Sequence, residues 1–136
     1  WDQTHSLNVN AFYLTQTGFQ VSLIGQFGSG LPYTPTQQNV RVALENSARK
    51  PITYRIDLMM YQDFTVSNVK ISPFLRIYNL FDRLNEQNVY TDTGRAGYTL
   101  NPYTNIRGVN SAEEYLNRPD FYGEPRRIQL GVEVTI

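Results

Sequence analysis

The sequence has no cysteine, which excludes disulfide bonds and thiolate metal sites. It also has no apolar run of the roughly 18 residues that a membrane-spanning helix requires. Neither sign of charge is in excess, since 12 basic residues balance 12 acidic ones, and nucleic acid is not expected as a partner. No Ser/His/Asp set, phosphate-binding loop or metal-ligand spacing is present, so we predict neither an enzyme nor a cofactor.

Aromatic side chains are the one excess, with ten tyrosines, seven phenylalanines and one tryptophan among 136 residues. This length corresponds to about one domain. Low overall hydropathy argues against a membrane helix protein but not against a membrane barrel, in which half of every strand is polar. A chain that opens on Trp1, without an initiator methionine or a signal peptide, is expected to be a fragment or a processed product.

The C-terminal stretch 128–136 alternates apolar and polar side chains without a break. Period two predicts a strand with one apolar and one polar face. Its length is about that which a tilted strand needs to cross the hydrocarbon of a bilayer. The predicted apolar face carries Ile128, Leu130, Val132, Val134 and Ile136.

The same alternation predicts strands over about 5–15 and 19–27. A three-residue loop between them pairs Thr15 with Phe19 and places both apolar sets on one side, whereas a two-residue loop would separate them. Gly18 falls where such a loop requires a left-handed residue. Face agreement and turn chemistry therefore predict the same register.

Two further strands are predicted over about 54–66 and 69–82, joined by a two-residue turn at 67–68. The final strand covers about 127–136. Pro73 falls opposite Gln62 and counts against an unbroken strand, because proline cannot donate to the ladder. The predicted register pairs Val66 with Val69, Phe64 with Ile71, Met60 with Leu75 and Leu58 with Ile77.

The stretches from 28 to 53 and from 83 to 125 lack any sustained period, and we expect them to be long loops. Short and long connections alternate, which places all short turns at one rim of an antiparallel sheet. This asymmetry, with aromatic residues near both ends of the strands, is typical of outer-membrane barrels. We therefore predict an all-β fold: an antiparallel up-and-down transmembrane β-barrel segment, about five strands of a larger barrel, with short periplasmic turns and long extracellular loops.

Several short motifs, taken in order, resemble the C-terminal barrel segment of TonB-dependent outer-membrane receptors. Residues 76–82, Arg-Ile-Tyr-Asn-Leu-Phe-Asp, followed by residues 89–94, are similar to the penultimate strand and the loop after it. The other similar segments are 1–5, 28–33, 55–58 and 123–127. The chain departs from the family at Ile136, where such barrels usually end in an aromatic residue.

The resemblance implies active uptake of a scarce nutrient, such as a metal chelate, a vitamin or an oligosaccharide, across the bacterial cell outer membrane. Such receptors have about 22 strands around a plug, and neither the plug domain nor the coupling segment lies in this sequence. The implied partners are outer-membrane lipid, the rest of the barrel and the plug, and an inner-membrane energy-coupling protein reached through parts outside this chain. The barrel assembly machinery would read the apolar positions of 128–136, and a surface lipoprotein is a further partner that the family allows.

Three charged residues, Asp57, Asp63 and Arg76, fall on the polar face and are predicted to face the lumen. The register makes Asp57 and Arg76 diagonal neighbours. They could line a solute path, but pairing with each other or with a plug is the alternative that we favour, because buried charges need partners.

The loops supply weaker ligand-binding candidates in Tyr98, Tyr103 and Arg107, since binding residues concentrate in loops. Packing of these side chains within the loop is the alternative. His5, the one histidine, is expected to be a polar residue at the rim and not a metal ligand. The acidic pair at 113–114 is expected to be solvated surface.

A soluble β-sandwich binding module is the alternative to the receptor, because alternating strands also fit a sheet with one face on a core. A sandwich needs a second apolar layer. Five strands with two long polar loops offer little from which to build one.

Overall fold

The computed structural model describes residues 2–101 and 111–136, and it confirms an all-β fold made mostly of antiparallel sheet. The chain divides into two compact units. The sheet unit comprises residues 7–27, 54–83 and 124–136, and the loop unit comprises residues 1–6, 28–53 and 84–123. No helix in the described part of the chain is long and apolar enough to cross a membrane.

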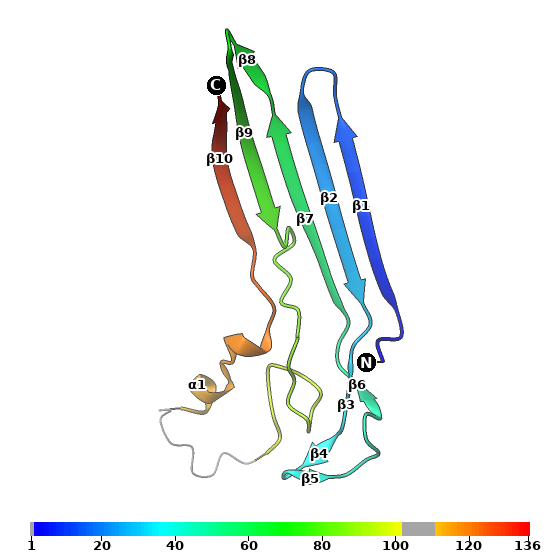
Figure 1. Cartoon of the computed structure of the whole chain (residues 1–136). Coiled ribbons are helices and arrows are strands. Elements are labelled where there is room, and N and C mark those ends of the chain that lie inside the picture. The colour runs from blue at the N-terminus through cyan, green and yellow to red at the C-terminus, as the bar shows by residue number, and fades with distance from the viewer. Residues whose placement is uncertain (1, 102–110) are drawn as a thin grey trace. The chain divides into compact units, whose positions relative to one another are not determined.

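Five long strands follow one another across the sheet unit in chain order (Figure 1). Both short turns and the C-terminus lie at the same end of this unit. The order is β1 (Ser6–Leu14), β2 (Phe19–Gly28), β7 (Thr53–Gln62), β9 (Val69–Tyr78) and β10 (Arg127–Thr135), and a short strand, β8 (Phe64–Val66), also pairs with β9.

The hairpin that joins β1 to β2 has the predicted three-residue loop. The Thr15 N–H donates to the Phe19 carbonyl at 2.8 Å, so these residues face each other across the loop. Gly18 has a φ of 80°, a left-handed conformation that glycine adopts without steric cost. The turn residue and the register therefore agree with the sequence prediction.

The pairing of β7 and β8 with β9 confirms the predicted register. Leu58 lies opposite Ile77, Met60 opposite Leu75, Phe64 opposite Ile71 and Val66 opposite Val69. Matching apolar faces was sufficient to fix this register because a one-residue slip would turn every side chain to the other face.

Pro73 lies in β9, but the strand that breaks opposite it is the neighbouring one, at Gln62 and Asp63. β9 runs unbroken through Pro73 and pairs it with Val132, whereas the predicted strand 54–66 is split into β7 and β8 after Gln62. The ladder pairs on the β7 side stop at Tyr61 and resume at Phe64. Because the missing proline donor is tolerated only where the ladder does not need it, the break falls on this side.

The predicted strand 69–82 is four residues too long, since β9 ends at Tyr78. Asn79 and Asp82 have left-handed φ values of 54° and 52°, a conformation that asparagine and aspartate tolerate better than most residues. The Asn79 side chain, 2% exposed, donates to the carbonyls of Arg83 and Glu124 at 3.0 Å and accepts from the Arg83 N–H. Residues 79–82 therefore form a turn that is fixed by a buried amide.

The loop unit is not wholly irregular, which corrects the prediction for residues 28–53. This stretch holds four two-residue strands in two small antiparallel ladders. They are β3 (Pro32–Tyr33) with β6 (Ala48–Arg49), and β4 (Thr36–Gln37) with β5 (Val40–Arg41). Strands this short leave no periodicity to detect.

The second part of the loop unit contains a short α-helix, α1 (Ala112–Leu116), and a 3₁₀ turn, η1 (Pro119–Phe121). The Ser111 hydroxyl caps α1 by accepting from the Glu114 N–H. A single bridge pairs Glu86 with Tyr122. Ala96 is the one fully buried apolar residue among those described, so the described part of this unit has little apolar core.

Candidate functional site on the polar face of the sheet

One face of the sheet unit, here called the polar face, gathers most of its charged side chains. The register places Met59 opposite Arg76, Gln129 opposite Arg76 and Arg127 opposite Tyr78, and side chains of directly paired residues project to the same side. Strand alternation then assigns to this face Arg55, Asp57, Met59 and Tyr61 of β7, Lys70, Ser72, Phe74, Arg76 and Tyr78 of β9, and Arg127, Gln129, Gly131 and Glu133 of β10.

Arg55 holds both carboxylates in its part of the polar face. Its Nε donates to Asp57 Oδ1 at 2.7 Å, and its Nη1 lies 3.5 Å from Glu124 Oε2. Asp57 Oδ1 also accepts from the Asn79 N–H at 2.8 Å, which ties β7 to the turn after β9. The predicted diagonal position of Asp57 and Arg76 agrees with the register, but the ion pair that Asp57 forms is with Arg55, two residues away on the same strand.

Arg76 is held by aromatic side chains. Its Nε donates to the Tyr61 hydroxyl at 2.7 Å, and its Cζ lies 4.6 Å from the ring centre of Phe74 and 5.4 Å from that of Tyr61. Guanidinium stacking on a ring leaves the edge of the fork, with its N–H donors, available to a further acceptor.

Arg127 is stacked in the same way, with its Cζ 4.5 Å from the centre of the Tyr78 ring directly across the ladder. Arg55 lies 5.7 Å from the same ring. Three arginines therefore converge on the aromatic residues of β7 and β9 at the end of the polar face nearer the long connections.

The opposite end of the polar face, at the short turns, is more acidic. Asp63 accepts from the Ser72 hydroxyl at 2.7 Å and from Lys70 Nζ at 3.0 Å. Its backbone N–H donates to the Gly18 carbonyl of the first turn at 3.1 Å. Asp63 thus joins the break in the β7 ladder to the β1–β2 turn.

Phe74 also covers a glycine in the next strand. Gly131 lies directly opposite Phe74, and a Cβ at Gly131 would collide with the Phe74 ring. The absence of a side chain at residue 131 therefore leaves room for the Phe74 ring, which the Arg76 guanidinium contacts.

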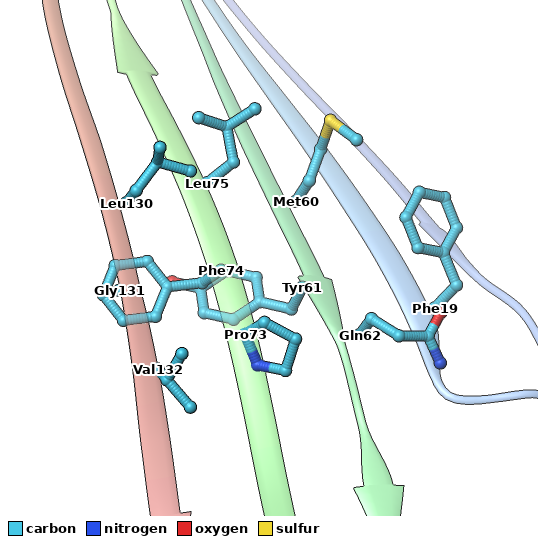
Figure 2. A pocket seen from close by; sticks show the side chains of 10 residues that line it. All are labelled: Phe19, Met60, Tyr61, Gln62, Pro73, Phe74, Leu75, Leu130, Gly131 and Val132. Atoms are coloured by element: carbon cyan, nitrogen blue, oxygen red, sulfur yellow. The ribbon is translucent and has the colours of Figure 1, made fainter.

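The apolar face of the sheet unit contains two open depressions. The larger, of about 520 Å³, is drawn in Figure 2 and has side chains from β2, β7, β9 and β10 around Pro73. The smaller, of about 390 Å³, lies where Gly25 leaves room between β1, β2 and β7. Phe19, Met60, Leu75, Leu130 and Val132 line the first, and Leu7, Val9, Leu23, Phe27 and Ile56 line the second.

The terminal strand carries its expected apolar set on this face. Leu130 is 79% exposed, and Ile128, Val132 and Val134 are also exposed. β10 ends at Thr135, so Ile136 lies just beyond the ladder and is fully exposed.

Of the three loop candidates, Tyr98 lies among the described residues. Tyr98 is half exposed, and its carbonyl accepts from the Thr93 hydroxyl at 2.8 Å. Tyr103 and Arg107 lie outside the described residues. The backbone of His5 exchanges two hydrogen bonds with Ser29, an arrangement that anchors the chain and involves no imidazole contact. The glutamates at 113–114 are exposed.

Asp92 organises the loop that contains Tyr98. Its Oδ2 accepts from the Thr99 hydroxyl at 2.6 Å and from the backbone N–H groups of Leu100 and Asn101. Burial raises the pKa of Asp92, but these hydrogen bonds together outweigh burial, and the net pKa lies below its ordinary value. Similarly, Glu86 raises the pKa of Arg95 through a paired contact of 2.8 Å.

The described residues contain no group of three or more histidine, aspartate or glutamate side chains that could hold a metal ion. The chain matches no protein-family model, no curated protein and no solved structure. What the polar face presents is a set of arginine and aromatic side chains, which are suited to binding. Sequence reasoning did not single out Arg55, Arg127, Tyr61 and Tyr78 as site residues, although strand alternation places all four on the same face as Arg76.

Proposed function

We propose that this chain is a C-terminal barrel segment of a TonB-dependent outer-membrane receptor that takes up a scarce nutrient, such as a metal chelate, a vitamin or an oligosaccharide. In this proposal the long strands span the bacterial outer membrane. Their apolar face contacts lipid, and the polar face with Asp57, Asp63 and Arg76 lines the lumen. The rest of the barrel, the plug, the barrel assembly machinery and the inner-membrane energy-coupling protein are its partners.

The observation that carries the proposal is the exposure of the apolar face of the sheet unit. No second sheet of this unit, all of whose residues are described, covers that face. A contiguous exposed apolar surface of this kind is rare in monomeric soluble proteins and typical of protein that contacts lipid or a partner. The exposed apolar positions include Leu7, Val9, Leu23, Phe27, Tyr54, Phe64, Ile128, Leu130, Val132 and Val134.

Strand dimensions also support the proposal. β2, β7 and β9 have ten residues each, and β1 and β10 have nine. A tilted transmembrane strand has about 9–11 residues. The connections alternate between two short turns and two long stretches, the asymmetry that outer-membrane barrels share, and the ordered motifs from residue 1 to residue 127 resemble the receptor family.

The alternative is a soluble β-sandwich binding module. It requires a second apolar layer, and many of the large apolar side chains described in the loop unit are exposed, as Leu44 at 81% illustrates. This supports contact with lipid over a sandwich layer built from the described residues.

The test is partitioning of the purified 136-residue chain between buffer and neutral-detergent micelles or phosphatidylcholine vesicles. We expect the chain to aggregate in buffer and to stay dispersed in detergent. In vesicles we expect residues 54–78 to be protected from added protease while residues 28–52 are cleaved. A chain that is monomeric and folded in buffer without detergent would refute the membrane proposal and favour the sandwich.

A further inference from the structure

The polar face contains two arginines whose charge no carboxylate of the described residues neutralises. The carboxylates of Asp57 and Glu124 both form ion pairs with Arg55. Among the residues that the structure describes, Arg76 and Arg127 make no ion pair. Arg76 contacts the rings of Phe74 and Tyr61 and the hydroxyls of Tyr61 and Tyr78, and Arg127 contacts the Tyr78 ring. Positive charge therefore remains on this part of the face.

The two arginines are neighbours on the same side of the sheet. Arg76 lies opposite Gln129, and Arg127 is two residues before Gln129 on β10, so Arg76 and Arg127 are diagonal partners. Diagonal neighbours have Cα atoms about 7–8 Å apart, within reach of two long side chains. The Gln129 side chain projects on the same face, directly opposite Arg76 and two residues from Arg127, and can donate a further hydrogen bond.

Each guanidinium is oriented before any ligand arrives. Arg76 is stacked on Phe74 and bonded to Tyr61, and Arg127 is stacked on Tyr78. Stacking restricts the rotamers of the arginine while leaving donors of the planar fork exposed, and this fork matches the geometry of a carboxylate. Less conformational entropy is then lost when an anion binds.

We propose that Arg76, Arg127 and Gln129 form a subsite for the carboxylate groups of a small multivalent anion. This deepens the proposed function, since it names the charge class of the solute that the polar face accepts. It rests on that function only for the role of the site in uptake, because the subsite itself can be measured without a membrane. Acidic residues lie at the other end of the same face, around Asp63 and Glu133, so the subsite has a defined position along the strands.

The test is isothermal titration calorimetry, in which the 136-residue chain in a neutral maltoside detergent at pH 7 is titrated with citrate. We expect Arg76→Gln and Arg127→Gln each to weaken citrate binding about tenfold, and Gln129→Leu by less. The matched control is Arg41→Gln, which removes the same charge from an exposed arginine that is paired with Glu45 in the loop unit. It should change the dissociation constant by less than twofold.

Two further arms make each outcome informative. Arg76→Lys retains the charge but not the planar fork, and we expect it to weaken binding several-fold while the fold is retained by circular dichroism. A capped peptide with two glutamates carries the same carboxylate chemistry as a protein segment would. Tighter binding of the peptide than of citrate would overturn the small-solute proposal.

Equal weakening by Arg41→Gln would show that general charge attraction accounts for binding, and absence of citrate binding would refute the subsite. Neither result bears on membrane insertion, which partitioning tests separately. If the chain proves soluble without detergent, the same titration is made in buffer, and the result tests the subsite independently of the membrane proposal.

Discussion

Leu58→Arg tests whether the apolar face of the sheet contacts hydrocarbon. Leu58 lies five residues after Thr53 and four before Gln62, so it is at the middle of β7. At a rise of about 3.3 Å per residue and a tilt of about 40°, each residue advances about 2.5 Å across the membrane, and ten residues span about 25 Å. This equals the height of the apolar band in outer-membrane barrels, and Leu58 falls at mid-height.

Arginine at that depth should cost about 2–4 kcal/mol of unfolding free energy. The matched control, Met59→Arg, places the same side chain one residue away on the polar face, where it lies opposite Arg76. Like charges that face each other across a ladder cost up to about 1 kcal/mol, so the control should lose less than Leu58→Arg.

The assay is denaturant unfolding of both variants in phosphatidylcholine vesicles with a thin bilayer, monitored by far-ultraviolet circular dichroism. A Leu58→Arg cost within about 0.5 kcal/mol of zero would mean that this face is ordinary solvent-exposed surface. Equal costs for the two variants would show that the assignment of the faces is wrong.

Three further predictions concern single residues. Gly18→Ala should lower the free energy of unfolding by about 1–2 kcal/mol in denaturant titration, because φ is 80° at this residue. The control, Gly97→Ala, has room for a Cβ and should change stability by less than about 0.5 kcal/mol. Similar values for the two variants would contradict the turn geometry. Asn79→Ala removes the buried amide that donates to the carbonyls of Arg83 and Glu124 and should cost about 1–3 kcal/mol, and a neutral result would argue against a stabilising role of this amide. The folded-state pKa of Asp92 is depressed below its ordinary value of 3.8, so its contribution to loop stability should be complete above pH 3.8 and be lost as pH falls through the folded pKa. Amide exchange of the loop measured against pH should show this loss in the wild type and not in Asp92→Asn.

The long strands and their register follow from side-chain parity. Matching Leu58 with Ile77 and Met60 with Leu75 required only that both apolar sets share one face, and the structure has these pairs. Gly18 gave an independent check through its turn. These features were predictable because the alternation is strict and a slip by one residue would invert it.

The end of β9 was not predicted, because residues 79–82 continue an apolar pattern through Leu80 and Phe81. The available signal was Asn79 and Asp82, residue types that adopt left-handed backbone and bond to neighbouring main chain. The short ladders of the loop unit had no such signal, since two-residue strands have no period.

The arginine and aromatic cluster depends on contacts that cross two ladders. Parity alone places Arg76, Tyr78 and Arg127 on one face. Which guanidinium stacks on which ring follows from the direct pairing of Arg127 with Tyr78 and from the space that Gly131 leaves for Phe74. Pairing of Asp57 with Arg55 and not Arg76 has the same origin, because Asp57 is also fixed by the Asn79 N–H.

The break in the ladder opposite Pro73 has a consequence for how the sheet opens. Because backbone pairing is lost at Gln62 and Asp63, the β8 tip is separated from the rest of β7, and it is attached instead to the first turn through Asp63 and Gly18. The Gln62 side chain adds a second link, since it donates to the Thr17 carbonyl at 2.9 Å. The two hairpin tips therefore form one cooperative opening unit, whose amides should exchange together and ahead of the amides at the centre of the strands.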